Sequence, residues 1–120
     1  DMGETWKEHE SSRTALPESI CMASLIHVKA KDNVLGKDIL LFSNPNTTEG
    51  RHSMTIKASL DGGYTWLSEN QLLVDSGSSW GYSCLSMIDQ ETVGILYEGS
   101  VAHMTFQAIN LKDIIKKIEP

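Results

Sequence analysis

The 120-residue sequence lacks the features that mark several common classes of protein. It has only two cysteines, Cys21 and Cys84, which are too few for a disulfide scaffold and do not form a zinc-binding pattern. We expect both to be buried thiols. The four histidines are scattered without the spacing of metal ligands, so we expect no metal and no cofactor. These histidines are His9, His27, His52 and His103.

Positive charge is also scarce. Ten Lys and Arg residues stand against sixteen Asp and Glu residues, which gives a net charge of −6 at pH 7. No basic stripe is visible, and this argues against binding to nucleic acid. A small anionic ligand stays compatible, because one well-placed arginine can outweigh a remote negative field. No apolar run approaches the length of a membrane span. The length of 120 residues suits one small domain or a piece of a larger one.

What the sequence does contain is an internal repeat: one turn recurs after 60 residues, and two strand segments recur after 50 and 55 residues. "MTIKA" at 54–58 matches "MTFQA" at 104–108, and "LLFSNP" at 40–45 resembles "ILYEGS" at 95–100. The turn in "DMGETW" also returns in "DGGYTW". The residues of the two turns that line up are Asp1, Gly3, Thr5 and Trp6 with Asp61, Gly63, Thr65 and Trp66.

The repeated segments have the composition of β-strands. They are rich in β-branched and apolar residues and are separated by turns with Gly, Pro, Asn and Asp. The predicted strands lie within 20–30, 38–44, 52–60, 82–89, 92–99 and 102–111. Helical spacing is confined to 111–120, where Leu111, Ile114, Ile115 and Ile118 share one face. The sequence therefore predicts an all-β fold with a short C-terminal helix.

The order of strands and turns suggests blades of a β-propeller. In each repeated unit three strands precede the next Asp-Gly turn, and this turn joins the third strand to a fourth. On this count the chain holds about two blades: 1–19 end one blade, 20–75 form a full blade, and 76–120 form a partial last blade with the terminal helix. The strand missing from that last blade would come from elsewhere in a parent chain, because closing the ring hides an edge.

The turn "SLDGGYTW" at 59–66 resembles the aspartate box of sialidases and related propellers. In such a turn the aspartate can accept hydrogen bonds from backbone amides, and the glycine adopts a backbone angle that other residues resist. The resemblance implies that both boxes have a structural role. They would lie on the rim away from the active site, with the tryptophan packed between neighbouring sheets.

A wider resemblance follows from the order of the motifs. "LLFSNP", Arg51, "MTIKASLDGGYTW", "GYSCLSMID" and "VGILYE" together resemble the C-terminal part of bacterial exo-α-sialidases of glycoside hydrolase family 33, close to the Bacteroides type. The resemblance covers nearly the whole chain. It implies part of a six-bladed β-propeller from a secreted, periplasmic or cell-surface bacterial glycosidase. The partners would be sialylated glycans and the remainder of its own propeller.

The resemblance also implies roles for three residues. Arg51 matches one of three arginines that bind the carboxylate of sialic acid, which suits a guanidinium fork. Tyr82 matches the catalytic nucleophile. A neutral phenol avoids the repulsion that a carboxylate nucleophile would meet beside the substrate carboxylate. Glu98 matches a glutamate that holds one of the arginines. The other two arginines, the acid and the base would lie outside this sequence.

Two other interpretations are kept. The chain could belong to a non-catalytic propeller module that binds glycans or protein, or to an aspartate-box hydrolase with another substrate. The set Arg51, Tyr82 and Glu98 favours the sialidase, because a scaffold has no need for it. We predict that these three side chains converge at one end of the β-structure, with both boxes at the opposite rim. We also expect residues 1–120 alone to be inactive.

Overall fold

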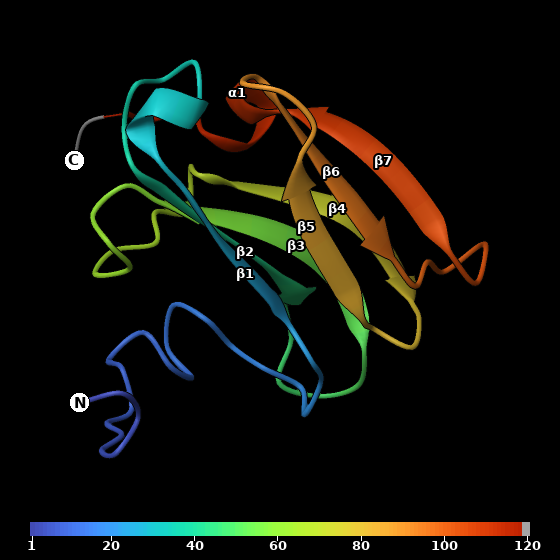
Figure 1. Ribbon diagram of the computed structural model, residues 1–120. Helices are drawn as coiled ribbons and strands as arrows, with labels where there is room; N and C mark the ends of the chain where they lie inside the picture. The colour runs from blue at the N-terminus through green and yellow to red at the C-terminus, as the bar shows by residue number, and fades with distance from the viewer. Residues whose placement is uncertain (119–120) are drawn as a thin grey trace.

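Two antiparallel β-sheets make up most of the protein (Figure 1). The computed structural model describes residues 1–118. The strands are β1 (Ser24–Val28), β2 (Ile39–Pro45), β3 (His52–Ser59), β4 (Gln71–Ser78), β5 (Ser83–Met87), β6 (Thr92–Tyr97) and β7 (Thr105–Asn110). The helices are a 3-10 turn at Ala30–Asp32 and α1 at Leu111–Ile114. The predicted all-β class is confirmed.

Each sheet follows the order of the sequence. The first sheet has the order β1-β2-β3-β4 and the second has β5-β6-β7, and neighbouring strands are antiparallel throughout. β5 lies against β1 and β2, where Ser43 Oγ and Ser83 Oγ are 2.7 Å apart. The Leu85 N–H donates to Ser24 Oγ at 3.0 Å. The strands of the second sheet thus repeat the first three strands of the first sheet, as the sequence repeat predicts.

The hydrophobic core lies between the two sheets. Alternation along the strands turns one apolar set inward, and this period of two is the one expected for a half-buried sheet. Ile39, Leu41 and Ile56 from the first sheet and Ile95 from the second are fully buried. Each such side chain contributes about 1.5–3 kcal/mol relative to leaving it in water.

The C-terminal helix is shorter than predicted. Asn110 caps α1 by accepting from the Lys112 N–H at 3.0 Å, and α1 ends at Ile114. Beyond it, the Asn70 side chain accepts from the amides of Lys116 and Lys117 and donates to the Lys117 carbonyl at 2.7 Å. These bonds hold the backbone on the first sheet in place of a further helical turn.

The predicted apolar face of that helix is only partly correct. Leu111, Ile114 and Ile115 are buried, whereas Ile118 is 44% exposed. The last two residues of the predicted segment, 119–120, lie outside the described residues.

The expectation of two buried thiols is wrong. Cys84 is exposed and Cys21 is half-buried. On β5 the inward positions are Ser83 and Leu85, so strand alternation turns Cys84 to the outer face.

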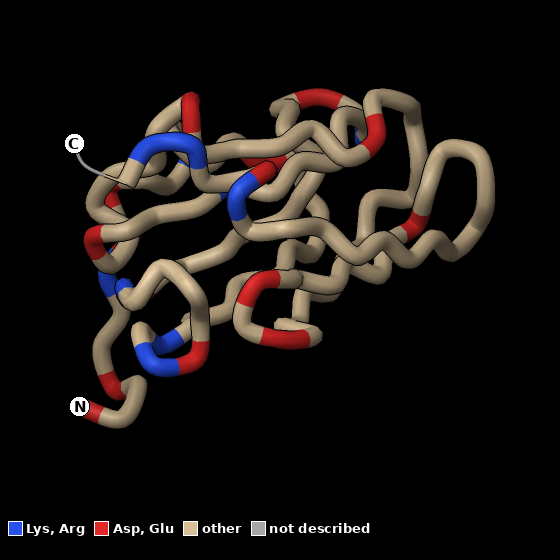
Figure 2. Tube along the Cα trace, turned by 90° about the horizontal axis from the view of Figure 1, so that it is seen from above, with Lys and Arg blue, Asp and Glu red and all other residues tan. Residues whose placement is uncertain are grey.

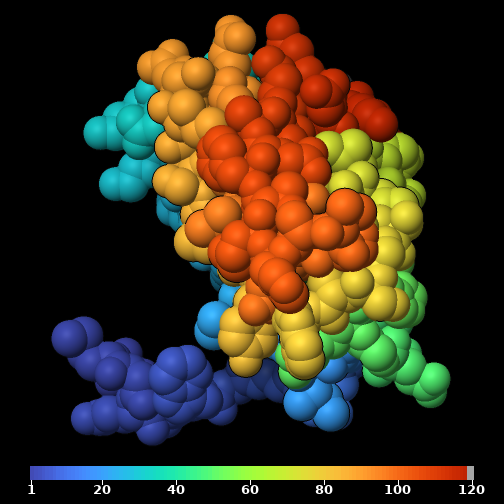
Figure 3. Space-filling model, turned by 90° about the vertical axis from the view of Figure 1, so that its right-hand side faces the viewer, coloured from blue at the N-terminus to red at the C-terminus, as the bar shows by residue number. Residues whose placement is uncertain are grey.

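The N-terminal segment, residues 1–19, runs along the first sheet and then projects from the body of the molecule (Figure 3). Two buried polar side chains of the sheet hold it: Asn44 Nδ2 donates to the Pro17 carbonyl at 2.8 Å, and Lys57 Nζ donates to the Ala15 carbonyl at 2.7 Å. Burial lowers the pKa of Lys57. The segment therefore covers polar groups that the sheet would otherwise leave exposed.

Charged residues are dispersed over the loops. In Figure 2 the Lys and Arg positions lie mostly on the left, among Asp and Glu positions that are spread over the whole view, and they form no basic stripe in that view of the described chain. Neither helix within residues 1–118 is long and apolar enough to cross a membrane.

Candidate active site

The structure brings Arg51, Tyr82 and Glu98 together. Arg51 directly precedes β3, Tyr82 directly precedes β5, and Glu98 directly follows β6. Because β5 and β6 are antiparallel, with Ser83 opposite Tyr97, the start of one strand lies beside the end of the other. The Tyr82 N–H donates to Glu98 Oε2 at 2.9 Å, and the Glu98 N–H donates to the Tyr82 carbonyl at 3.0 Å.

Two backbone carbonyls hold the guanidinium of Arg51. Its Nη1 donates to the Trp80 carbonyl at 2.8 Å, and its Nη2 donates to the Ile20 carbonyl at 2.9 Å. Its Cζ lies 5.7 Å from the centre of the Tyr82 ring, within the range of a cation–π contact. The cation is thus oriented by the protein, and its remaining N–H donors can bind an anion.

Gly81 lets the chain pass close to Arg51. Its φ is +94°, and a Cβ on it would lie 2.8 Å from Cys21 Sγ and 3.0 Å from Pro45 Cγ. No side chain fits there without displacement of its neighbours, and the backbone angle favours glycine. The absence of a side chain at Gly81 therefore lets Trp80 and Tyr82 take their places around the arginine.

Ile20 has an unusual backbone conformation for a β-branched residue, with φ +56°. Its N–H donates to Glu18 Oε2 at 2.6 Å, and its carbonyl accepts from Arg51. Such a conformation costs about 1–3 kcal/mol and persists where the surroundings hold it. Sequence reasoning missed this residue, because no sequence pattern around Ile20 indicates a left-handed backbone conformation.

Glu98 makes no salt bridge in the described part of the chain. The ion pairs found within residues 1–118 are Arg13–Glu8, His27–Asp38 and Lys117–Glu69. Glu98 therefore does not pair with Arg51. Its carboxylate supports the Tyr82 backbone instead, and its predicted hold on an arginine stays a prediction.

The Cys21 thiol lies near these groups, with Sγ 3.9 Å from the Trp80 carbonyl oxygen. Burial raises the pKa of Cys21, and Glu98 and Glu18 raise it further, while Arg51 acts in the opposite direction. The thiol therefore stays protonated at neutral pH, so Cys21 is a poor nucleophile. Residues 1–118 contain no group of three or more His, Cys, Asp or Glu side chains arranged to hold a metal ion.

The two aspartate boxes share a hydrogen-bond pattern. In the second box, Asp61 accepts from the Thr65 N–H at 2.9 Å and from Thr65 Oγ1 at 2.7 Å, and Trp66 Nε1 donates to the Gly63 carbonyl at 3.0 Å. The first box repeats these bonds: Thr5 donates its N–H at 3.0 Å and its hydroxyl to Asp1, and Trp6 donates to the Gly3 carbonyl at 2.8 Å. The repeated sequence thus gives repeated turns.

The boxes lie away from the candidate site. Arg51 precedes β3 and the second box follows it, so the whole strand separates them. In Figure 1 the turn after β3 lies at the left, whereas the β2–β3 and β4–β5 connections lie at the bottom and lower right. The N-terminal segment joins the box side, where the His9 ring lies 5.9 Å from the Tyr64 ring.

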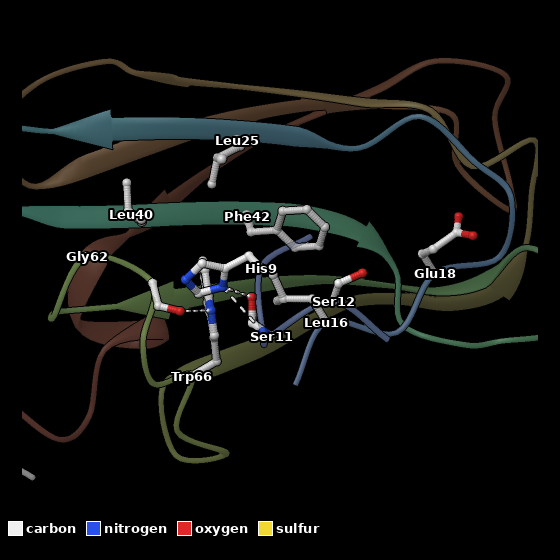
Figure 4. Close-up of a pocket in the computed structure, with 11 residues that line it drawn as sticks. His9, Ser11, Ser12, Leu16, Glu18, Leu25, Leu40, Phe42, Gly62 and Trp66 are labelled. Atoms are coloured by element: carbon white, nitrogen blue, oxygen red, sulfur yellow. Dashed lines mark hydrogen bonds between the residues drawn. The ribbon is translucent and has the colours of Figure 1, made fainter. Parts of the chain in front are cut away.

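A cavity of about 410 Å³ also lies on the box side (Figure 4). It lies between the N-terminal segment and the outer face of β1 and β2. Leu25, Leu40 and Phe42 line it, and Trp66 meets the Phe42 ring edge-on at 6.1 Å. Glu18, which accepts from the Ile20 N–H, also lines this cavity, and no lysine or arginine is among its lining residues.

Comparison of the fold defines the class of protein. The structure is similar to that of the Hadza microbial sialidase Hz136, with a TM-score of 0.89 and 68% identity, over 96% of this chain and 22% of that one. The two sheets therefore match part of a sialidase domain, a β-propeller-type fold, and the predicted fold class is confirmed.

The sequence comparison agrees. The chain is 78% identical, over 116 residues, to a sialidase of Bacteroides fragilis (strain YCH46), and this alignment takes in 97% of the chain and 21% of the relative. No family model matches the sequence. The chain thus spans about a fifth of the length of the relatives it matches. The predicted resemblance to bacterial sialidases is confirmed.

Proposed function

We propose that the protein containing this chain is an exo-α-sialidase that removes terminal sialic acid from glycans. One observation carries the proposal: a guanidinium held by two carbonyls lies 5.7 Å from the ring of Tyr82, at one end of the sheets. Both relatives described above are named sialidases, which supports the same activity for the parent protein.

Arg51 would bind the carboxylate of sialic acid. A guanidinium fork matches the two oxygens of a carboxylate, and a cation already held in place loses less freedom when the ligand arrives. The contacts of Arg51 with Trp80 and Ile20 support this role, because they orient the fork before any substrate is bound.

Tyr82 would act as the nucleophile. Its phenol oxygen forms a bond to the anomeric carbon while the bond to the leaving group breaks, and a base outside this sequence takes the phenol proton. An acid, also outside this sequence, protonates the leaving group. Water then breaks the tyrosyl–sugar bond, so two displacements retain the configuration. The side chain is 45% exposed, which supports access by substrate.

A phenol suits this substrate for an electrostatic reason. Sialic acid carries its carboxylate on the anomeric carbon itself. A carboxylate nucleophile about 4 Å away would be repelled by roughly 4 kcal/mol at an effective dielectric constant near 20. Glu98, by the same proposal, would hold one of the arginines contributed by the rest of the protein, since a forked cation needs a fixed counter-charge.

We assign 1–19 to the end of one blade, 20–75 to a full blade and 76–120 to a partial last blade. The remainder of the propeller would cover β7 and the outer face of the second sheet, where Leu96, Phe106 and Ile88 are 44%, 60% and 53% exposed. A substrate on secreted or cell-surface glycans would place the protein outside the cytoplasm: secreted, periplasmic or on the cell surface.

The test uses the intact protein and a fluorogenic sialoside. Tyr82→Phe should lose most turnover but still bind a transition-state-like sialic acid analogue, because the phenol oxygen acts only in the chemical step. Arg51→Lys should raise KM, because an ammonium group cannot reproduce the fork. Wild-type turnover in Tyr82→Phe would contradict the assignment of Tyr82 as the nucleophile. Glycan binding without hydrolysis by the wild type would favour the non-catalytic module.

A further inference from the structure

The carboxylate of Asp75 joins the two sheets beside the candidate site. Asp75 lies in β4, and its partner Ser100 lies in the turn between β6 and β7. The Ser100 N–H donates to Asp75 Oδ2 at 2.8 Å and Ser100 Oγ donates to Oδ1 at 2.7 Å. The Gly77 N–H also donates to Oδ1, at 2.9 Å. Both carboxylate oxygens are therefore used.

The contact is also close. A Cβ placed on Gly77 would overlap the side chain of Ser100. The backbone of β4 therefore packs directly against that side chain, and position 77 has no room for a larger residue. In Figure 1 the end of β4 lies beside the β6–β7 turn. The hydrogen bonds from Ser100, and then the one from Gly77, lower the pKa of Asp75, which keeps the group ionised at neutral pH.

The turn that Asp75 holds is the one that carries Glu98. Ser100 follows Glu98 by two residues, and the Gly99 N–H closes the turn on the Ala102 carbonyl at 3.2 Å. Glu98 in turn exchanges two hydrogen bonds with the backbone of Tyr82. The β6 end of the turn is thus anchored both on β4, through Ser100, and on the start of β5, through Glu98.

The same end of β4 also supports Arg51. The Ser79 N–H donates to the Arg51 carbonyl at 2.9 Å. One strand end therefore contacts the backbone of Arg51 and the turn of Glu98. A shift of β4 relative to the second sheet would change the distance between these two groups.

We propose that Asp75 is a positioning residue for the candidate active site: by holding Ser100 it fixes the turn that places Glu98 against Tyr82. This inference rests on the proposed roles of Tyr82 and Glu98. Asp75 itself need not touch the substrate. It acts through the geometry of the groups that do, and small displacements of such groups cost activity disproportionately.

The test compares variants of the intact protein. Asp75→Asn keeps the size of the side chain but has only one acceptor oxygen, so it cannot accept all three hydrogen bonds that Ser100 and Gly77 donate to Asp75. Ser100→Ala removes the hydroxyl bond alone and is the milder change. Asp89→Asn is the matched control: Asp89 accepts from the Glu91 N–H at 2.8 Å in the turn at the other end of β5 and β6.

Per folded molecule, Asp75→Asn should lower kcat/KM on the fluorogenic sialoside by about ten- to a hundredfold. Ser100→Ala should lose less, and Asp89→Asn should match the wild type. The decisive measurement is a double-mutant cycle. In a Glu98→Gln background, Asp75→Asn should cause little further loss, because the two residues act through one geometry.

Additive losses in the cycle would overturn the inference. So would an Asp75→Asn protein with a lower Tm but unchanged kcat/KM per folded molecule. Failure of the proposed function looks different: the wild type does not hydrolyse the sialoside, or Tyr82→Phe keeps wild-type turnover. Either of those results removes the inference as well, whereas unchanged kcat/KM in Asp75→Asn, beside an inactive Tyr82→Phe, removes the inference alone.

Discussion

At the scale of single residues, the backbone around Arg51 adopts two left-handed conformations by different means. Gly81 takes φ +94° at no steric cost, whereas Ile20 takes φ +56° against its preference and is held by Glu18 and Arg51. The two residues place the carbonyls of Trp80 and Ile20 on the guanidinium. Orientation of the cation therefore depends on backbone geometry more than on neighbouring charges.

Gly81→Ala should lower both stability and activity. The new methyl group would lie 2.8 Å from Cys21 Sγ, and the alanine would have to keep a positive backbone φ. We expect a loss of about 1–3 kcal/mol in the free energy of unfolding, together with a higher KM for the sialoside. Urea unfolding and steady-state kinetics of the intact protein measure these effects. Gly36→Ala, at φ +62° with no atom near its Cβ, is the control for the backbone cost alone.

Asp61 should stabilise its turn in a pH-dependent way. Burial opposes its ionisation, but the hydrogen bonds from Thr65, Ser59 and Tyr64 outweigh burial and lower its pKa below the ordinary 3.8. The folded state thus favours the ionised form. This contribution is present above the unfolded pKa and is lost as the pH falls through the lower folded value.

Asp61→Asn should therefore unfold more easily than the wild type at pH 7. The difference between the two proteins should shrink as the pH falls below 3.8. Urea denaturation across that pH range measures it. A difference that stays constant with pH would show that the charge of Asp61 does not stabilise the turn.

At the scale of elements, the connection of α1 to the first sheet depends on one side chain. Asn70 is 2% exposed and makes three hydrogen bonds to the backbone of Lys116 and Lys117. It replaces the bonds that a longer helix would have formed within itself. The segment after α1 therefore follows the sheet, and the apolar spacing at 111–118 does not continue as a helix.

Asn70→Ala should lower the free energy of unfolding by about 1–3 kcal/mol, because it removes three hydrogen bonds made by a buried side chain. Asn70→Asp keeps an acceptor oxygen for the two amides, and at a pH where the acid is protonated its O–H can also donate to the Lys117 carbonyl, so its cost should be smaller there. Hydrogen exchange of the Lys116 and Lys117 amides should accelerate in Asn70→Ala. Unchanged exchange there would contradict the role given to Asn70.

At the scale of the whole molecule, the described chain holds a four-stranded sheet and a three-stranded sheet built on the same arrangement of strands. β5, β6 and β7 repeat the arrangement of β1, β2 and β3, and the two copies enclose one core. The chain spans about a fifth of the sialidases it matches. Much apolar surface on the outer faces is consequently exposed, including Leu73 at 55% and Phe106 at 60%.

Residues 1–120 alone should show no sialidase activity. The fragment would hold one of the proposed arginines and the nucleophile, without the acid or the base, and each such group is typically worth about 10²–10⁴-fold. Its exposed edge and apolar faces should also cause self-association. Gel filtration followed by a fluorogenic sialoside assay on each peak tests both expectations. A well-behaved monomer that hydrolyses the sialoside would contradict them.

The sequence by itself determined the two boxes and the range of every strand except β4, for which it indicates only a fourth strand after the second box. Each depends on local rules: alternation of apolar residues sets the exposed face of a strand, and an Asp, a Gly and a Thr at set spacing form a turn. The repeat then implied that the second sheet copies the first. Arg51, Tyr82 and Glu98 could be chosen only because the order of motifs resembles known sialidases.

The tertiary structure alone decided what surrounds those three residues. The acceptors of Arg51 are the carbonyls of Trp80 and Ile20, and a backbone carbonyl has no signature in the sequence. The link from Asp75 to Ser100 crosses between sheets, over 25 residues of chain, and depends on how the sheets pack. The C-terminal segment likewise follows Asn70. Local patterns set the elements, whereas contacts between elements, which no local pattern encodes, set the geometry of the site.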